Sequence, residues 1–99
     1  MKVVNIRNEK CDVYIGRQRH GHHFGNPFSR EHYPLMNRDE RIGAFRLWIT
    51  EKDYKNVEPQ RREWILKNLH QLHGKLGCYC KPKACHGDVY LELIGENND

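Results

Sequence analysis

No stretch of this chain is apolar for anything near the roughly 20 residues that a membrane-spanning helix requires. The first ten residues, MKVVNIRNEK, are too few and too polar for a secretory signal peptide. Internal repeats and low-complexity segments are also missing, which excludes a solenoid and a disordered linker. We therefore expect an intracellular, cytoplasmic protein with no membrane partner.

Cysteine and net charge are both modest. Four cysteines would allow two disulfides in a secreted domain, but without an export signal free thiols or a metal site are the better interpretation. The net charge of +4 favours an anionic partner without deciding between a polymer and a small molecule. A chain of 99 residues, 37% hydrophobic and 30% charged, predicts one globular domain over residues 1–99.

The spacing of apolar residues predicts three short strands and three helices, in the order β-β-α-α-β-α. The strands are expected at 2–6, 12–15 and 75–80, and the helices at 37–50, 59–74 and from Cys85 or His86 to 94. The two central helices are long enough for a crossover that makes the third strand parallel to the first. The predicted fold class is α/β: a small single-layer sheet of about three strands with flanking helices, a Rossmann-like fragment.

Two helix starts carry local signals. Asn37 is a good N-cap, and Glu40 three residues later completes the pattern of a capping box. Pro59 suits the first turn of the next helix. In contrast, residues 16–35 show no periodicity, and a loop of this length is usually functional or mobile.

In a parallel sheet the ligand crevice lies beyond the carboxyl ends of the strands. Arg7 follows the first predicted strand, the loop 16–28 follows the second, and the turn 81–88 follows the third. We expect these segments to converge on one cleft.

The loop contains the sequence RQRHGHHFGNPF. Its donors suit a phosphate, although a solvated basic loop is an equally good interpretation; they are Arg17, Arg19, His20, His22 and His23. The segment GNPF contains Gly25, Asn26 and Phe28. Its proline, Pro27, forces an extended backbone at Asn26. We expect a rigid bend, anchored by Phe28, that presents the Asn26 amide to a base or amide edge.

The turn contains CHGD at the start of the last predicted helix. The first turn of a helix has backbone N–H groups without internal partners, and phosphate oxygens bind there readily. Gly87 would let a ligand approach, His86 would donate to an anion, and Asp88 would accept from ribose-type hydroxyls or only stabilise the helix. Cys85 at this place would have a lowered pKa, so a nucleophilic thiol is an alternative.

The same segment allows a zinc site. Its ligands would be Cys78, Cys80, Cys85 and His86, with the spacing C-x-C-x4-C-H. Structural zinc sites usually have wider ligand pairs, and buried cysteines on a strand are the alternative. We therefore expect no cofactor, and a bound zinc ion is the alternative.

These motifs resemble a family of phage and bacterial proteins that is known only as a domain of unknown function. The matching blocks are VVNIR at 3–7, YIGR at 14–17, GNPF at 25–28 and GCYCKPKACHGDV at 77–89. The resemblance implies a compact protein that acts inside a bacterial cell. Because some small phage proteins capture host nucleotide signals, it also favours a nucleotide-like ligand.

We expect a protein that binds a small phosphorylated, nucleotide-derived molecule and sequesters it, with phosphates on Arg7, Arg17 and the turn 85–88. An enzyme acting on such a molecule is one alternative, with Cys85, His86 or Asp88 as the reacting group. A zinc-stabilised module that binds nucleic acid or protein is the other. A homodimer with Trp48 or Trp64 in its contact would enclose the ligand.

Overall fold

The computed structural model describes residues 1–19 and 21–95, and over these residues a parallel sheet of three strands carries the fold. The strands are β1 (Lys2–Asn5), β2 (Val13–Tyr14) and β3 (Lys75–Cys78). The order β1-β3-β2 places β3 in the centre, with Leu76 opposite both Val3 and Val13. The predicted α/β class, element order and parallel pairing are confirmed, although each strand is shorter than predicted.

A short crossover joins the two edge strands. Residues 6–12 pass over β3 at Gly77, where a Cβ atom would lie 2.5 Å from Cys11 Sγ and 2.6 Å from Ile6 Cγ2. Only a glycine leaves room for this contact, so Gly77 allows the loop to cover one face of the sheet directly. All strands consequently end at the same edge.

The helices are α1 (Arg38–Ile49), α2 (Pro59–Lys67) and α3 (Gly87–Ile94), with a 3₁₀ turn η1 (Leu69–Gln71) after α2. Asn37 and Glu40 form the predicted capping box, and Pro59 opens α2 as predicted. The prediction that the second helix continues to residue 74 is wrong, because α2 ends at Lys67. Gly74 has φ +62° and leads into β3 instead.

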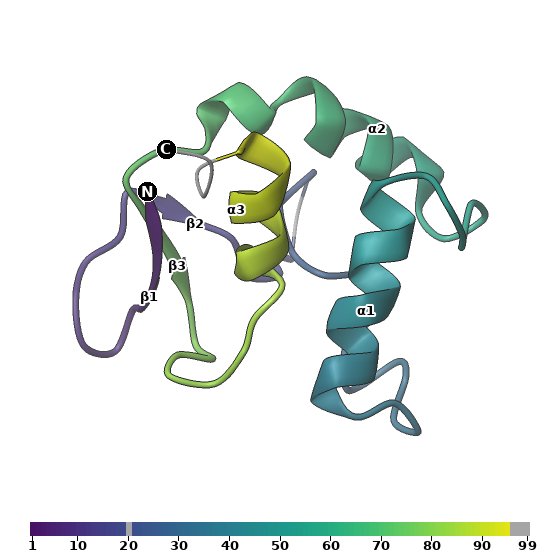
Figure 1. The fold of residues 1–99 in the computed structure, drawn as a ribbon, viewed down its shortest axis with the longest axis horizontal. Coiled ribbons are helices and arrows are strands. Elements are labelled where there is room, and N and C mark those ends of the chain that lie inside the picture. The colour runs from purple at the N-terminus through teal and green to yellow at the C-terminus, as the bar shows by residue number, and fades with distance from the viewer. Residues whose placement is uncertain (20, 96–99) are drawn as a thin grey trace.

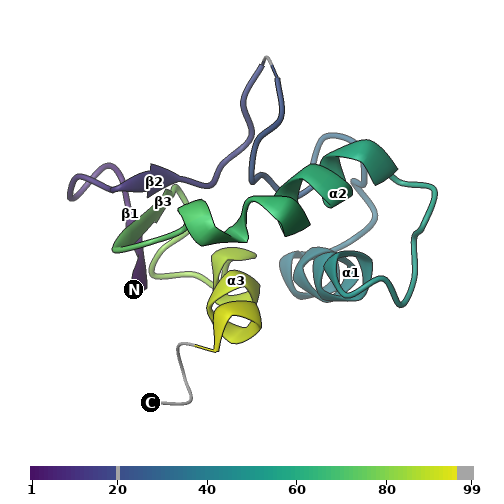
Figure 2. The same cartoon turned by 90° about the horizontal axis from the view of Figure 1, so that it is seen from above.

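The three helices gather on one side of the sheet, and α3 lies next to the strands (Figures 1 and 2). Leu76 and Cys78 face this side and are buried in the core with Phe45, Trp48 and Tyr90. Strand alternation predicted this face for Leu76 and Cys78, and their burial agrees with it.

Gly87 packs the start of α3 against the sheet. A Cβ atom there would lie 2.7 Å from Ile15 Cδ1 and 2.8 Å from Val3 Cγ2. The space beside Gly87 is therefore filled by the sheet, and the expected close approach of a ligand has no room there.

Trp48 is inside the core and not at a subunit contact. Its side chain is fully buried, and Nε1 donates to the carbonyl oxygen of Val57 at 2.6 Å. The expectation of Trp48 in a dimer interface is wrong. Among the described residues, no helix has both the length and the apolar character needed to cross a membrane.

Candidate functional site

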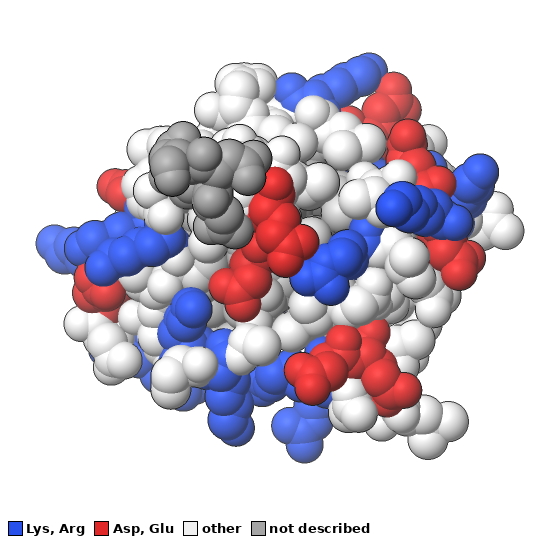
Figure 3. All heavy atoms as spheres, in the orientation of Figure 1, with Lys and Arg blue, Asp and Glu red and all other residues white. Residues whose placement is uncertain are grey.

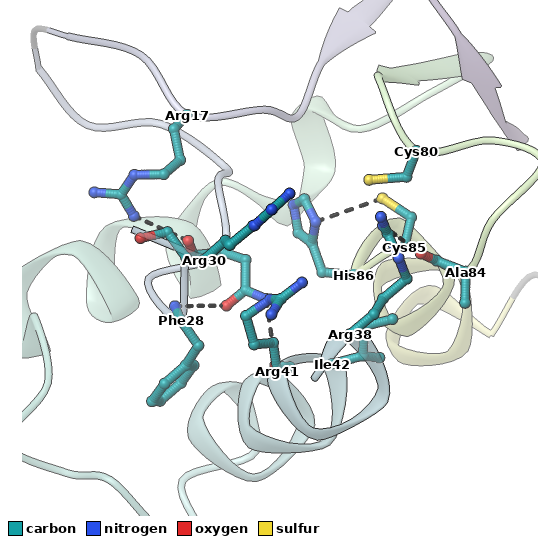
Figure 4. Close-up of a pocket in the computed structure, with 12 residues that line it drawn as sticks. Arg17, Phe28, Arg30, Arg38, Arg41, Ile42, Cys80, Ala84, Cys85 and His86 are labelled. Atoms are coloured by element: carbon teal, nitrogen blue, oxygen red, sulfur yellow. Dashed lines mark hydrogen bonds between the residues drawn. The ribbon is translucent and has the colours of Figure 1, made fainter. Parts of the chain in front are cut away.

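A pocket of about 270 Å³ lies where α1, the loop after β2 and the turn after β3 meet (Figure 4). The structure thus brings the loop and the turn together, as the parallel topology suggested. The lining residues are Arg17, Asn26, Phe28, Ser29, Arg30, Arg38, Arg41, Ile42, Cys80, Ala84, Cys85 and His86.

Arg7 does not line this pocket. Its guanidinium lies over the ring of Tyr79, 5.1 Å from the ring centroid. The Arg7 backbone N–H donates to the side chain of Asn5. The structure therefore separates Arg7 from the other predicted phosphate ligands.

Four arginines surround the pocket, and no aspartate or glutamate is among its described lining residues. Arg17 donates to the carbonyl oxygen of Asn26 at 2.9 Å, and Arg38 donates to that of Ala84 at 3.3 Å. Arg41 donates to the Met36 carbonyl oxygen at 2.5 Å. Arg30 makes no hydrogen bond or ion pair with any described residue, so its charge is available to a ligand.

Only Arg17 of these four was expected from the sequence. Arg38 and Arg41 lie at the start of α1, where no site residue was predicted. Arg30 lies in the loop that had no periodicity at all. The capping box located the start of α1, but nothing in the sequence placed that start beside the end of β3.

Arg61 is a second residue that the sequence did not single out. It is 5% exposed, and its Nη1 donates to the carbonyl oxygens of His23 at 3.0 Å and Gly25 at 2.6 Å. Its Nε donates to Glu58 at 2.9 Å. A buried charge with these partners fixes the loop that carries Arg17 and Asn26.

Asn26 forms the predicted rigid bend, but its side chain is already engaged. Oδ1 accepts from the Phe28 backbone N–H at 2.9 Å, and Nδ2 donates to the Arg41 carbonyl oxygen at 3.3 Å. Phe28 is buried against Tyr33 and Tyr54, as an anchor should be. The amide edge expected to read a base thus holds the loop to α1.

Gly25 is required by a close approach of the backbone and not by a positive φ. A Cβ atom there would lie 2.8 Å from Arg17 Cα and 2.9 Å from Arg17 N. The absence of a side chain lets the two arms of the loop touch. This contact positions Arg17 at the rim of the pocket.

The backbone at the start of α3 does not offer the free amides that we expected. The N–H of Cys85 donates to Asp88 Oδ2 at 3.3 Å, and the N–H of Gly87 donates to Cys85 Sγ at 3.4 Å. The N–H groups of Asp88 and Val89 donate to carbonyl oxygens of the same turn. Because the N–H groups of Cys85, Gly87, Asp88 and Val89 are used internally, the arginines are the main donors for an anion.

Asp88 stabilises this turn. Besides accepting from Cys85, its carboxylate lies 3.7 Å from Lys81 Nζ. The second of its two expected roles, support of the helix start, fits this geometry, and the contact with a ribose hydroxyl has no support.

His86 is buried and neutral. Its Nε2 donates to the carbonyl oxygens of Ile15 at 2.9 Å and Phe24 at 3.0 Å, so the lone pair is on Nδ1. Burial lowers the pKa of His86, because the charged ring would lose its hydration. Nδ1 lies 3.5 Å from Cys85 Sγ. Nε2 of His86 is therefore not available to donate to an anion. The expectation that His86 donates to an anion has no support in this geometry.

Three cysteines meet at the edge of the pocket, as Figure 4 shows in part. The sulfur atoms of Cys78, Cys80 and Cys85 all lie within 4.8 Å of one another. Hydrogen bonds from Cys78 and Cys85, with Arg38 nearby, lower the pKa of Cys80. Hydrogen bonds with Cys78 and Cys80, together with burial, raise the pKa of Cys85. The direction of the two pKa shifts therefore favours Cys80 over Cys85 as the thiol that ionises, opposite to the prediction of a lowered pKa at Cys85.

The histidines of the loop are partly structural. His22 stacks on Trp64 with the ring centroids 5.6 Å apart. His23 Nδ1 accepts from the Gly25 N–H at 3.1 Å, and burial next to Arg61 lowers the pKa of His23 to about 4. The expected role of His20 lies outside the described residues.

These features define a small α/β protein with an arginine-lined pocket at the carboxyl edge of a parallel sheet. The chain belongs to the family described as "Domain of unknown function (DUF4326)", whose model matches residues 2–96. It is also similar to a protein of Enterobacteria phage T4 described as "Uncharacterized 12.4 kDa protein in nrdA-td intergenic region". The two are 33% identical over 95 residues, which cover 94% of this chain and 76% of the phage protein. No solved structure gives a significant match. The resemblance deduced from the motifs is confirmed.

Proposed function

We propose that this protein binds a small phosphorylated molecule in the arginine-lined pocket, and that this molecule is derived from a nucleotide. The observation that carries the proposal is the set of four arginines around one pocket without a lining carboxylate. Guanidinium groups bind phosphate oxygens through paired hydrogen bonds. Within the described part of the chain, only Arg17 of the four arginines has a carboxylate nearby, Glu58 Oε2 at 4.0 Å, so the pocket keeps an excess of positive charge that favours a multiply charged anion.

The size and surroundings of the pocket favour a small molecule over a nucleic acid. A volume of about 270 Å³ suits a compact ligand and is at the small end for ligand sites. On the face shown in Figure 3, acidic side chains lie among the basic ones and uncharged residues cover much of the surface. Nucleic-acid binding usually uses a continuous basic surface. The similarity to a phage protein supports the cytoplasm of a bacterial host as the place of action.

Capture is favoured over turnover by the state of the predicted reacting groups. Cys85 and His86 are buried, and Asp88 is paired with Lys81. Cys80 is the thiol that lines the pocket with a lowered pKa, so a nucleophilic reaction would use Cys80. Release of the ligand unchanged on denaturation is therefore the expected behaviour.

The test is calorimetric titration with a fixed panel: inorganic phosphate, pyrophosphate, adenosine and guanosine mono-, di- and triphosphates, and cyclic dinucleotides. Arg30→Gln removes a charge that has no partner among the described residues, so the fold should be unaffected. Loss of one charge-assisted contact should weaken binding at least about tenfold.

Arg46→Gln is the matched control, because Arg46 is on α1 but pairs with Glu92 outside the pocket at 2.9 Å. This variant should bind like the parent protein. Failure of every probe to bind, or equal affinity in Arg30→Gln and the parent protein, would overturn the proposal. A product appearing in the incubated mixture would replace capture with catalysis.

A further inference from the structure

We propose that the three clustered cysteines bind a zinc ion, with Nδ1 of His86 as the fourth ligand. The inference does not depend on the proposed phosphate site, because the sulfur cluster and the arginines are different groups on the same pocket wall. The sequence left two interpretations of the cysteines open, namely buried hydrophobic side chains and metal ligands. The proposal takes the second.

The first argument is the distance between the sulfur atoms. The atoms come from the end of β3 and the turn before α3, and all three pairs are within 4.8 Å. In a tetrahedral site with Zn–S bonds of about 2.3 Å the sulfurs are about 3.8 Å apart. The cluster is thus near the required geometry before any metal binds, and binding draws the sulfurs slightly closer.

The second argument is the environment of the sulfurs. The N–H of Cys80 donates to Cys78 Sγ, and the N–H of Gly87 donates to Cys85 Sγ, each at 3.4 Å. Such N–H donors stabilise thiolate charge and are part of what orients metal ligands. Thiols that only pack as apolar side chains do not require such N–H donors.

The third argument is the tautomer of His86. A histidine that binds a metal through one nitrogen usually donates its other N–H to a backbone carbonyl or carboxylate. His86 does this with the carbonyl oxygens of Ile15 and Phe24, which leaves the Nδ1 lone pair 3.5 Å from Cys85 Sγ. In a tetrahedral zinc site the sulfur and nitrogen ligands are about 3.5 Å apart, a spacing that the Cys85–His86 pair already has. His86 is not within 4.8 Å of all three sulfurs, so its ring has to shift toward the cluster when the ion binds.

The donor set selects the metal. Three thiolates and an imidazole form a soft tetrahedral site, which suits zinc and excludes magnesium and calcium. Arg38, whose guanidinium lies near Cys80, offsets the negative charge that three thiolates bring to a divalent ion. A zinc ion would also use the Cys80 sulfur, so a metal-loaded protein has no free nucleophile at the pocket.

The experiment measures metal content in the full chain purified from zinc-supplemented cells, followed by cobalt substitution. We expect about one zinc per chain and the visible absorption of tetrahedral cobalt bound by thiolates. Cys80→Ser and Cys78→Ser should each lose most of the bound metal. Cys11→Ser is the matched control, since Cys11 lies against Gly77 on the opposite face of the sheet.

X-ray absorption at the zinc edge of the parent protein tests the fourth ligand without any substitution in the core. Three sulfurs together with the outer-shell scattering of an imidazole ring support the assignment. Three sulfurs with a light-atom ligand that lacks this ring scattering overturn the role of His86. A parent protein that neither carries zinc nor develops the cobalt spectrum overturns the whole inference. Retention of zinc in the double variant Cys78→Ser/Cys80→Ser would do the same.

Discussion

Arg61 on α2 donates to the carbonyl oxygen of Gly25 at 2.6 Å, across 36 positions of the chain. The same nitrogen reaches the carbonyl oxygen of His23, and the guanidinium also pairs with Glu58. This one buried side chain ties the irregular loop after β2 to the helical half of the molecule. The arginine pocket depends on it, because Arg17 and Asn26 belong to that loop.

Replacing Arg61 with methionine should therefore destabilise the protein strongly. The change leaves two buried carbonyl oxygens without their donor, and each unsatisfied buried group costs about 1–3 kcal/mol. The Glu58 carboxylate is 40% exposed, so solvent replaces most of its lost ion pair. Urea denaturation measures the loss in the free energy of unfolding. Arg46→Gln removes an exposed ion pair and should cost no more than about 1 kcal/mol. Equal losses in the two variants would contradict the role given to Arg61.

Two glycines should respond in opposite directions to the same substitution. In Gly87→Ala the new methyl group meets Ile15 and Val3 at under 3 Å, and overpacking of this kind costs about 1–3 kcal/mol. In Gly43→Ala the methyl group meets no atom within 4 Å, and the helix gains about 0.5–1 kcal/mol. Thermal unfolding of both variants checks the pair. A stabilised Gly87→Ala would show that α3 is not held against the sheet as described.

The stability of the protein should rise with pH across the range from about 4 to about 6.5. Burial lowers the pKa of His23 to about 4 in the folded chain, whereas an unfolded histidine titrates near 6.5. Between these values the unfolded chain binds more protons, so acid favours unfolding, and His23 contributes at most about 3 kcal/mol.

Denaturation at a series of pH values measures this slope. His23→Asn should reduce the slope, and the part that remains comes from the buried His86, whose pKa is also lowered. His70→Gln, a change at an exposed histidine, serves as the control that keeps the slope. An unchanged slope in His23→Asn would exclude His23 as its source.

The capping box of α1 should contribute measurably to stability. Asn37→Ala removes the acceptor for the Glu40 N–H, which is 2.8 Å away, and loss of such a cap costs about 0.5–2 kcal/mol. Asn37→Ser keeps an acceptor at the same place and should lose much less. The free energies of unfolding of the two variants and the parent protein give the comparison. If alanine and serine were equivalent here, the hydrogen bond would carry no stability.

Local signals predicted the elements of this fold well. The capping residues, the proline at the start of α2 and the alternation along β3 depend on neighbours within a few positions, and the structure shows each of them. Element ends were less accurate, because the last residues of β1 and β3 and the end of α2 depend on partners that are distant in the chain. Gly74, for example, was expected to end a helix, but it turns the chain from η1 into the central strand.

The candidate site was predictable only in outline. The parallel topology indicated the edge at which the loop and the turn meet, and both line the pocket. The roles of single residues were not predictable, since Asn26, Asp88 and the amides of the last turn are satisfied by partners within the fold. Arg30, Arg38 and Arg41 had no sequence feature that distinguished them from ordinary surface arginines.

The sequence by itself determined the α/β class, the family and the cysteine-rich turn, because these follow from periodicity and short motifs. Only the tertiary structure decided which arginines surround the pocket, which thiols line it and which nitrogen of His86 is free. Those properties depend on contacts between segments tens of residues apart, and a linear pattern contains no distance between them.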